Sequence, residues 1–296
     1  MQKVRDALIE VIIIILIGGL IGAVLAVVSN LFVIGVQWFG QQREASEMLS
    51  LTIAGDTVSF SSVIFLWAAA AVVVVLKTGL GIARWTGPAD STYAAQQVNE
   101  PLDIKTGLAS TLAAFASASG GGSVGQYGPI VHFGATMGIW VKRFISSRLS
   151  HEIYLGCGVA AAISAGFNAP IAGVIFAHEA ILRHFSVRAI APITVASVSA
   201  SALGNQWFPQ TTTFEISSVL PPLAEVVPVL VMLAPAFALV AICFMAALRY
   251  SAQTAERMNT SPLLLPFFAA TICGLVGVWI PQILGLGISS INEMIA

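Results

Sequence analysis

Charge is scarce in this sequence. Only 9% of the 296 residues are Asp, Glu, Lys or Arg, whereas a soluble domain carries about 25%. Hydrophobic residues make up 57%, and the mean hydropathy is +0.90. This composition excludes a soluble enzyme with one membrane anchor and predicts a multi-pass membrane protein whose partner is the lipid bilayer. The net charge of −1 favours no further partner, and we expect no nucleic acid.

Cysteine is also scarce, since the chain has only Cys157, Cys243 and Cys273. All three lie in apolar runs without the spacing of a metal site or a redox pair, so we expect small buried side chains. No pair of nucleophile and base has a spacing that would indicate catalysis. We therefore expect neither an enzyme nor a bound metal or cofactor.

Long uncharged runs dominate what is present. The first, 11–42, has 32 positions without a charge, enough for a tilted membrane-spanning helix. Residues 1–10 are expected to form a cytoplasmic or amphipathic lead-in, and 43–56 a polar loop. A short helix is expected from Gly87 and Pro88 to about Asn99, capped by Asp90 and Ser91. The other expected helices are 58–76, 104–119, 130–144, 153–166, 171–184 and 189–207.

Positive charge predicts the orientation of the chain. Basic residues flank the first two spans on one side, at Lys3, Arg5, Lys77 and Arg84. The loop on the other side mixes Arg43 with Glu44, Glu47 and Asp56. Because cytoplasmic loops carry an excess of Lys and Arg, we expect a cytoplasmic N-terminus in an inner or plasma membrane.

Two glycine- and proline-containing breaks interrupt these runs. The 36 uncharged positions between Lys105 and Lys142 are broken at 120–129, and a second break lies at 166–170. Freed backbone groups are tolerated at membrane depth only where they lie within protein or line a cavity. A helix that begins there directs its first N–H groups and its positive dipole end at the cavity, which favours an anion.

The pattern begins again after Glu225. Two long spans, 226–248 and 263–284, resemble the opening pair and predict a second repeat of inverted topology. We therefore divide the chain into a first repeat, 1–222, and the start of a second, 223–296. A second repeat of equal length would need about 100 more residues, so it is expected to be truncated.

Both breaks carry motifs that resemble the CLC family of chloride channels and chloride/proton antiporters. Residues 125–129, Gly-Gln-Tyr-Gly-Pro, are similar to the G-[KR]-E-G-P segment of that family. Residues 166–179 are similar to its F-N-A-P-[LI]-A-G-x-x-F-x-x-E stretch. The resemblance covers nearly the whole chain and implies an all-α polytopic membrane protein with re-entrant broken helices. It also implies a homodimer whose interface includes 171–184 and 189–207.

The resemblance implies transport of small anions, chloride above all, and an anion site at Thr86, Gly125, Gln126, Tyr127 and Gly128. Thr86 matches a serine of the family that donates its hydroxyl to the anion. Tyr127 stands where the family has a gate glutamate.

Both proton-handling positions of the family differ here. Tyr127 replaces the gate carboxylate, and a tyrosine with a pKa near about 10 carries protons poorly. The second proton-handling glutamate corresponds to Ala180, directly after Glu179. Passive conduction is therefore favoured over proton-coupled antiport.

Several alternatives stay open. The chain is alternatively a truncated or degenerate membrane protein without transport of its own, because the family's second anion-binding helix start is not found after Leu286. Glu179 is expected to pair with Arg183 at i+4 rather than to carry protons. His132 and His178 are expected to be packed or hydrogen-bonded helix residues rather than proton relays, and Tyr127 either blocks the entrance or fills space.

Overall fold

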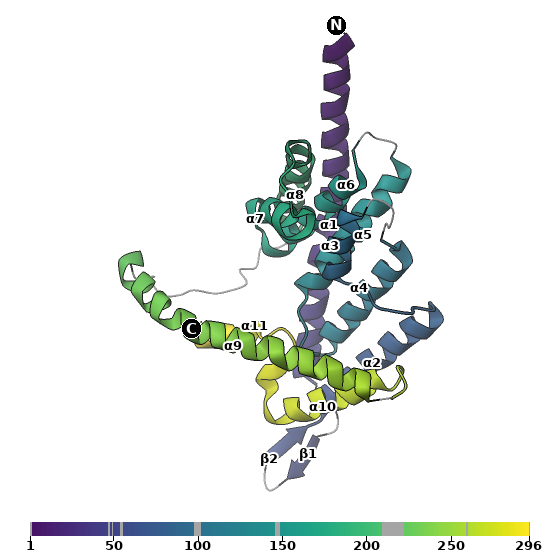
Figure 1. Ribbon diagram of the computed structural model, residues 1–296. Helices are drawn as coiled ribbons and strands as arrows, with labels where there is room; N and C mark the ends of the chain where they lie inside the picture. The colour runs from purple at the N-terminus through teal and green to yellow at the C-terminus, as the bar shows by residue number, and fades with distance from the viewer. Residues whose placement is uncertain are drawn as a thin grey trace.

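The computed structural model describes residues 2–46, 48, 50–53, 56–97, 102–145, 149–208, 222–258 and 260–295. Within them the chain is almost entirely helical (Figure 1). Its helices are α1 (Gln2–Glu44), α2 (Ser61–Gly79), α3 (Pro88–Gln96), α4 (Ile104–Ser119), α5 (Tyr127–Phe144), α6 (His151–Phe167), α7 (Pro170–Phe176), the π-helical turn η1 (Ala177–Leu182), α8 (Val187–Trp207), α9 (Leu223–Arg257), α10 (Leu265–Trp279), the 3-10 turn η2 (Pro281–Ile283) and α11 (Ile288–Ile295). Glu47 and Asn99, used in the predictions above, lie outside the described residues.

The N-terminal lead-in and the polar loop are two corrections to the sequence predictions. The lead-in is not separate, because α1 already begins at Gln2. The loop contains the strand β1 (Ser50–Ile53), which pairs antiparallel with β2 (Asp56–Ser59), from Ser50 with Ser59 to Ile53 with Asp56, and β2 extends into the predicted span 58–76. This hairpin lies at the opposite end of the molecule from the N-terminus (Figure 1). The all-α prediction is otherwise confirmed.

Helix α6 forms the centre of the core, and α1, α5 and α8 pack around it. Its small residues allow the neighbours to approach closely, which is how helices associate in membranes. A Cβ placed on Gly158 would overlap the carbonyl of Gly134 on α5, and a Cβ on Gly138 would overlap the carbonyl of Tyr154. The α5–α6 contact therefore depends on glycine on both helices.

By length and apolar composition, four helices of the described part of the chain can cross a membrane: Val11–Glu44, Ser61–Gly79, Val187–Trp207 and Leu223–Arg257. Helix α1, with 43 residues, is about 65 Å long and exceeds a hydrocarbon core of about 30 Å. The helices next to the two breaks, α4 to α7, are shorter and lie in or against the core.

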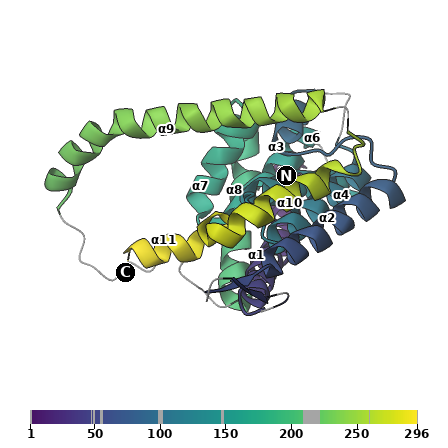
Figure 2. The same ribbon diagram turned by 90° about the horizontal axis from the view of Figure 1, so that it is seen from below.

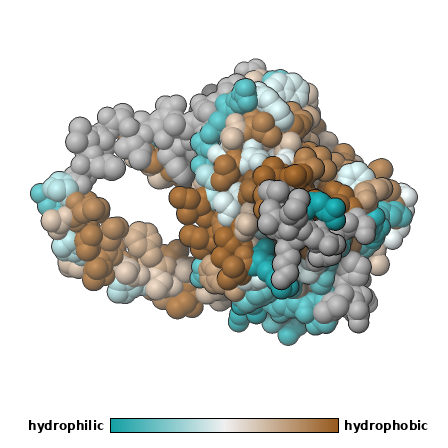
Figure 3. Space-filling view, turned by 90° about the horizontal axis from the view of Figure 1, so that it is seen from above, coloured by the Kyte–Doolittle hydropathy of each residue, from teal (hydrophilic) through white to brown (hydrophobic). Residues whose placement is uncertain are grey.

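Helix α9 stands apart from this core. None of its described residues is buried, and it runs along the edge of the molecule in Figures 1 and 2. Its surface is largely apolar, as the projecting arm at the left of Figure 3 shows. Helices α10 and α2 pack together nearby, where the Trp67 indole donates to the Thr271 hydroxyl at 3.0 Å.

Candidate functional site

The first break, between α4 and α5, is a glycine turn held by two distant segments. Gly121 has a φ of 98°, a left-handed conformation that favours glycine. Its carbonyl accepts a hydrogen bond of 2.9 Å from the Gly285 amide. The buried Arg43 guanidinium occupies the space that a side chain at 121 would need. A larger residue at 121 would therefore displace both the turn and this cation.

Helix α5 begins at Tyr127, three residues earlier than predicted, with Pro129 in its first turn. The first amides of a helix have no acceptor in a preceding turn, so those of Tyr127 and Gly128 are left for other partners. The N-cap residue Gln126 is 2% exposed, and its Oε1 has no hydrogen-bond partner among the described residues. This buried helix start is electrically positive and suits an anion.

The second break, between α6 and α7, depends on Asn168. Its φ of 51° places it in the left-handed region, which asparagine tolerates better than most residues. The Ser201 hydroxyl donates to Asn168 Oδ1 at 2.8 Å, and the Ser197 hydroxyl donates to the Pro170 carbonyl at 2.8 Å. Helix α7 then begins at Pro170, one residue earlier than predicted, and continues through η1 to Leu182, two residues short of the predicted end.

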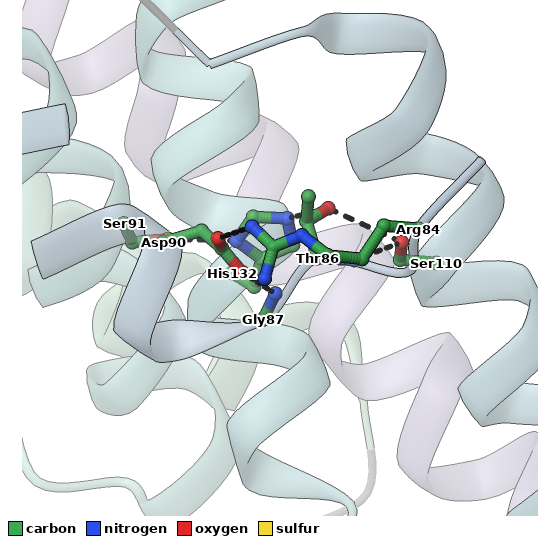
Figure 4. A network of polar contacts seen from close by, with 7 residues as sticks. All are labelled: Arg84, Thr86, Gly87, Asp90, Ser91, Ser110 and His132. Atoms are coloured by element: carbon green, nitrogen blue, oxygen red, sulfur yellow. Dashed lines mark hydrogen bonds and ion pairs between the residues drawn. The ribbon is translucent and has the colours of Figure 1, made fainter. Parts of the chain in front are cut away.

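A third helix start, that of α3, lies near the other two. The Gly87 amide donates to the Asp90 carboxylate at 2.8 Å, and Arg84 forms an ion pair with the same carboxylate (Figure 4). Asp90 therefore caps the helix as predicted. Ser91 does not cap it, because its hydroxyl is directed at His132 instead.

His132, on α5, joins the start of α3 to α5. Its ring is 1% exposed. Ring atom Nε2 lies 2.8 Å from the Thr86 hydroxyl, and Nδ1 lies 2.7 Å from the Ser91 hydroxyl. The Thr86 amide donates to the Ser110 hydroxyl of α4 at 2.9 Å. Figure 4 shows these residues converging from α3, α4 and α5.

Two cavities adjoin the helix starts. The first, which we call the three-helix cavity, has a volume of about 470 Å³ and is lined by Pro88, Gly128 and Ala169 from the starts of α3, α5 and α7. Its remaining lining is also uncharged: Tyr127, Val131, Ile163, Phe167, Ala172 and Phe176. The second, the glycine-loop cavity, has a volume of about 560 Å³ and is lined by 123–126, Tyr127, Phe167, 285–286, Ile288 and Ile291.

An aromatic pair lines both cavities. Tyr127 and Phe167 stack with ring centroids 3.7 Å apart and planes inclined by 24°. Both residues belong to the lining of the three-helix cavity and of the glycine-loop cavity. The stack joins the first residue of α5 to the last residue of α6, and so links the two breaks directly.

The structure brings most of the predicted anion-site residues together. Gly125, Gln126 and Tyr127 line the glycine-loop cavity, while Tyr127 and Gly128 line the three-helix cavity. Thr86 lines neither, and its hydroxyl is directed at His132 and Ser110.

Sequence reasoning missed two residues of this region, His132 and Phe167. Phe167 lies directly before Asn168 in the second break, and this place in the motif was the available signal. His132 was expected to be packed or hydrogen-bonded, but nothing in its neighbours along the chain pointed to Thr86, 46 positions away, as its partner.

Glu179 and Ala180 lie in η1, away from both cavities. The expected ion pair of Glu179 with Arg183 is absent from the described residues, where the ion pairs are Arg43–Glu44 and Arg84–Asp90. The reason is geometric, because the wider π-helical turn and the left-handed φ of 57° at Arg183 remove the i+4 spacing of an α-helix. Glu179 is exposed, whereas its neighbour His178 is buried.

The sequence is similar to known chloride channel proteins. Residues 68–296 match the family model described as voltage gated chloride channel. The chain is 26% identical over 140 residues to a putative ClcB-like chloride channel protein of Ralstonia nicotianae, covering 46% of this chain and 33% of that one. It is 22% identical over 198 residues to the voltage-gated ClC-type chloride channel ClcB of Yersinia pseudotuberculosis, covering 63% of this chain and 45% of that one. The chain thus spans less than half the length of these curated relatives.

Solved structures show the same fold. A CLC-type fluoride/proton antiporter superposes with a TM-score of 0.75 and 21% identity, over 96% of this chain and 70% of that one. A slow cyanobacterial Cl⁻/H⁺ antiporter superposes with a TM-score of 0.72 and 16% identity, over 93% and 66%. The motif resemblance at both breaks is thereby confirmed, and the chain belongs to the voltage gated chloride channel (CLC) family.

Proposed function

We propose that this chain contributes a pathway for small anions, chloride above all, across a membrane. One observation carries the proposal: the starts of α3, α5 and α7 supply Pro88, Gly128 and Ala169 to the lining of one uncharged cavity. The start of α5 presents the free amides of Tyr127 and Gly128, and the starts of α5 and α7 add positive dipole ends, whereas Asp90 caps the start of α3. Their convergence favours an anion without any basic side chain.

The absence of charge from this cavity lining suits transport rather than tight binding. A full positive charge in the wall would hold an anion strongly, whereas conduction needs a site that the anion can also leave. Partial charges of about half a unit at each helix start meet both needs. Gly128 and Ala169 also leave the backbone accessible, because neither has a bulky side chain.

Tyr127 is proposed as the gate of this pathway. The Tyr127–Phe167 stack lies between the three-helix cavity and the glycine-loop cavity, so an ion that passes from one to the other must separate or bypass the rings. The amides of Gln126, Tyr127 and Gly128 are proposed as anion contacts on either side of it. Thr86 would join them by turning its hydroxyl away from His132.

Passive conduction is proposed rather than proton exchange. The two solved structures are of antiporters, and at these low identities they inform the fold alone. In this chain the gate position carries a tyrosine and the second proton-handling position carries Ala180. No described carboxylate lines either cavity, so there is no acid there to alternate with the anion.

A homodimer in an inner or plasma membrane, with a cytoplasmic N-terminus, is proposed for the assembly. The outer surfaces of α7 and α8 support it, because their large apolar residues are exposed, with Ile171 at 77% and Val187 at 88%. Lipid or a second copy would cover them. We also propose that the chain divides at residue 222 into a first repeat and the start of an inverted second repeat.

The test is chloride flux from liposomes that contain the purified chain. We expect chloride to leave along its gradient when a potassium ionophore balances charge, without proton movement. Proton uptake driven by the chloride gradient alone would exclude passive conduction. Absence of any flux from well-folded protein would favour the alternative, a membrane protein of this family without transport of its own.

A further inference from the structure

His132 is a buried titratable residue in the hydrogen-bond network behind the three-helix cavity (Figure 4). It is buried, and its two ring nitrogens bind two hydroxyls, those of Thr86 at 2.8 Å and Ser91 at 2.7 Å. Both hydroxyls belong to the segment that starts α3, whereas the next residue before His132 on α5, Val131, lines the three-helix cavity. The ring therefore lies directly behind two of the three converging helix starts.

The neutral and the protonated ring of His132 bind the two hydroxyls differently. A neutral imidazole has one N–H and one lone pair, so one of the two hydroxyls must donate its own hydrogen to the ring. A protonated imidazole has two N–H groups, and it donates to both hydroxyls. Both hydroxyl hydrogens are then released for other acceptors. For Thr86 the nearby alternative within the protein is Ser110, 3.2 Å away, whose oxygen already accepts from the Thr86 amide.

The charges around the ring leave room for such a change. On the α3 side the charged groups are Asp90 and Arg84, which pair with each other, and Asp90 is also held by the Gly87 amide. Helix α4 contributes the neutral Ser110. Helix α6 meets α5 with Gly158 and Ala162, which carry no charge. Among the described residues named above, only a protonated His132 would offer an unpaired positive charge to a single anion in the three-helix cavity.

We propose that His132 is a positioning residue of the anion site that takes up a proton when an anion binds. This inference rests on the proposed function, because it assumes an anion near the starts of α3 and α5. A lone cation or a lone anion is costly to bury, and the two together cost less. The proton and the anion therefore favour each other's binding. In the tautomer in which the Thr86 hydroxyl donates to the neutral ring, protonation also frees that hydrogen to point at the anion.

This coupling is one of binding and by itself carries no proton across the membrane. At His132 the proton and the anion bind together, and by linkage each raises the affinity for the other by the same factor. The coupling modulates a passive pathway and adds no exchange. We expect chloride to bind at least about fivefold more tightly at pH 5 than at pH 7.5, within the usual range of such couplings.

The experiment measures protons taken up when sodium chloride replaces sodium gluconate around the full-length chain in weakly buffered detergent. The unaltered chain is expected to take up a fraction of one proton per chain, and His132→Gln to take up none. The control is His184→Gln, which changes an exposed histidine after η1 whose ring Nδ1 lies 2.9 Å from the Leu182 carbonyl, and it should behave like the unaltered chain. Uptake that is absent from the unaltered chain, or equal in His132→Gln, would overturn the proposal.

A second measurement needs no variant and covers the case in which His132→Gln does not fold. With ¹⁵N-labelled histidine, chloride should convert one ring of the unaltered chain to the doubly protonated form, and an unchanged spectrum would count against the inference. Liposome flux separates the two proposals. Chloride-linked proton uptake without flux would refute transport and leave the role of His132 standing, whereas flux without such uptake would do the reverse.

Discussion

Removing one ring of the Tyr127–Phe167 stack tests the gate directly. If the stack blocks the route between the two cavities, conduction needs the rings to separate. Tyr127→Ala deletes one ring and leaves the backbone amides at the start of α5 in place. The expected result is a larger chloride flux with little change in the affinity for chloride.

The expected increase in chloride flux follows from the energy of the Tyr127–Phe167 stack. An aromatic pair is worth about 0.5–1.5 kcal/mol beyond the area it buries, so the stacked state outweighs the separated state by about 2- to 13-fold. The separated state is then populated for about a third to a fourteenth of the time, and removing the stack raises flux about 3- to 14-fold. The centroid distance of 3.7 Å is shorter than the about 4.5–7 Å that aromatic pairs prefer, which favours the lower half of this range.

The assay is chloride efflux from liposomes at equal protein density, and Phe167→Ala should give a similar increase. The double variant should do no more than either single one, because both remove the same contact. Tyr93→Ala is the matched control, since Tyr93 is exposed on α3 and lines neither cavity. An unchanged or smaller flux from folded Tyr127→Ala would show that the ring fills space and does not gate.

Three further predictions concern the scaffold. Gly158→Ala should lower the melting temperature in detergent sharply or prevent folding, because its Cβ would overlap a carbonyl of α5, at a cost of about 2 kcal/mol or more. The control is Gly125→Ala, whose Cβ would have nothing within 4 Å and which should melt like the unaltered chain. Asn168→Ala should cost about 1–2 kcal/mol through its left-handed φ, and Asn168→Gly should recover the part due to the backbone; equal losses would contradict this. Hydrogen bonds from Thr106 lower the pKa of Asp103, the N-cap of α4. The stability that the Asp103 carboxylate adds is therefore complete above its unfolded pKa of about 3.9, and it is lost as the pH falls towards the lower pKa of the folded state. Asp103→Asn should flatten this acid part of the plot of melting temperature against pH.

The two breaks could be read from the sequence because their cause is local. Glycine ends a helix at 120 and proline begins one at 170 wherever they stand, and α4 was predicted with its observed bounds. The uncharged runs likewise predicted the membrane class, since burial of charge in lipid is costly whatever the fold. The hairpin β1–β2 was missed because two strands of four residues each, beside a segment of mixed charge, carry too weak a sequence pattern.

The π-helical turn was missed for a different reason. Residues 171–184 have an ordinary apolar helical pattern, and the extra residue per turn in Ala177–Leu182 arises where the helix packs against α3 and α6. That insertion moves Glu179 out of reach of Arg183 and leaves it exposed. A sequence period cannot reveal it, because packing against neighbouring helices decides which turn widens.

The sequence by itself determined that this is a membrane protein of broken helices and, to within three residues, where α3, α5 and α7 begin, because proline, glycine and the lack of charge act locally. Only the tertiary structure decided which side chains meet there. Tyr127 meets Phe167 across 40 positions, and His132 meets Thr86 across 46, because α6 brings the two breaks together and α5 brings the ring to α3. Contacts of that separation depend on how helices pack, and packing depends on small residues along the whole of α5 and α6 at once.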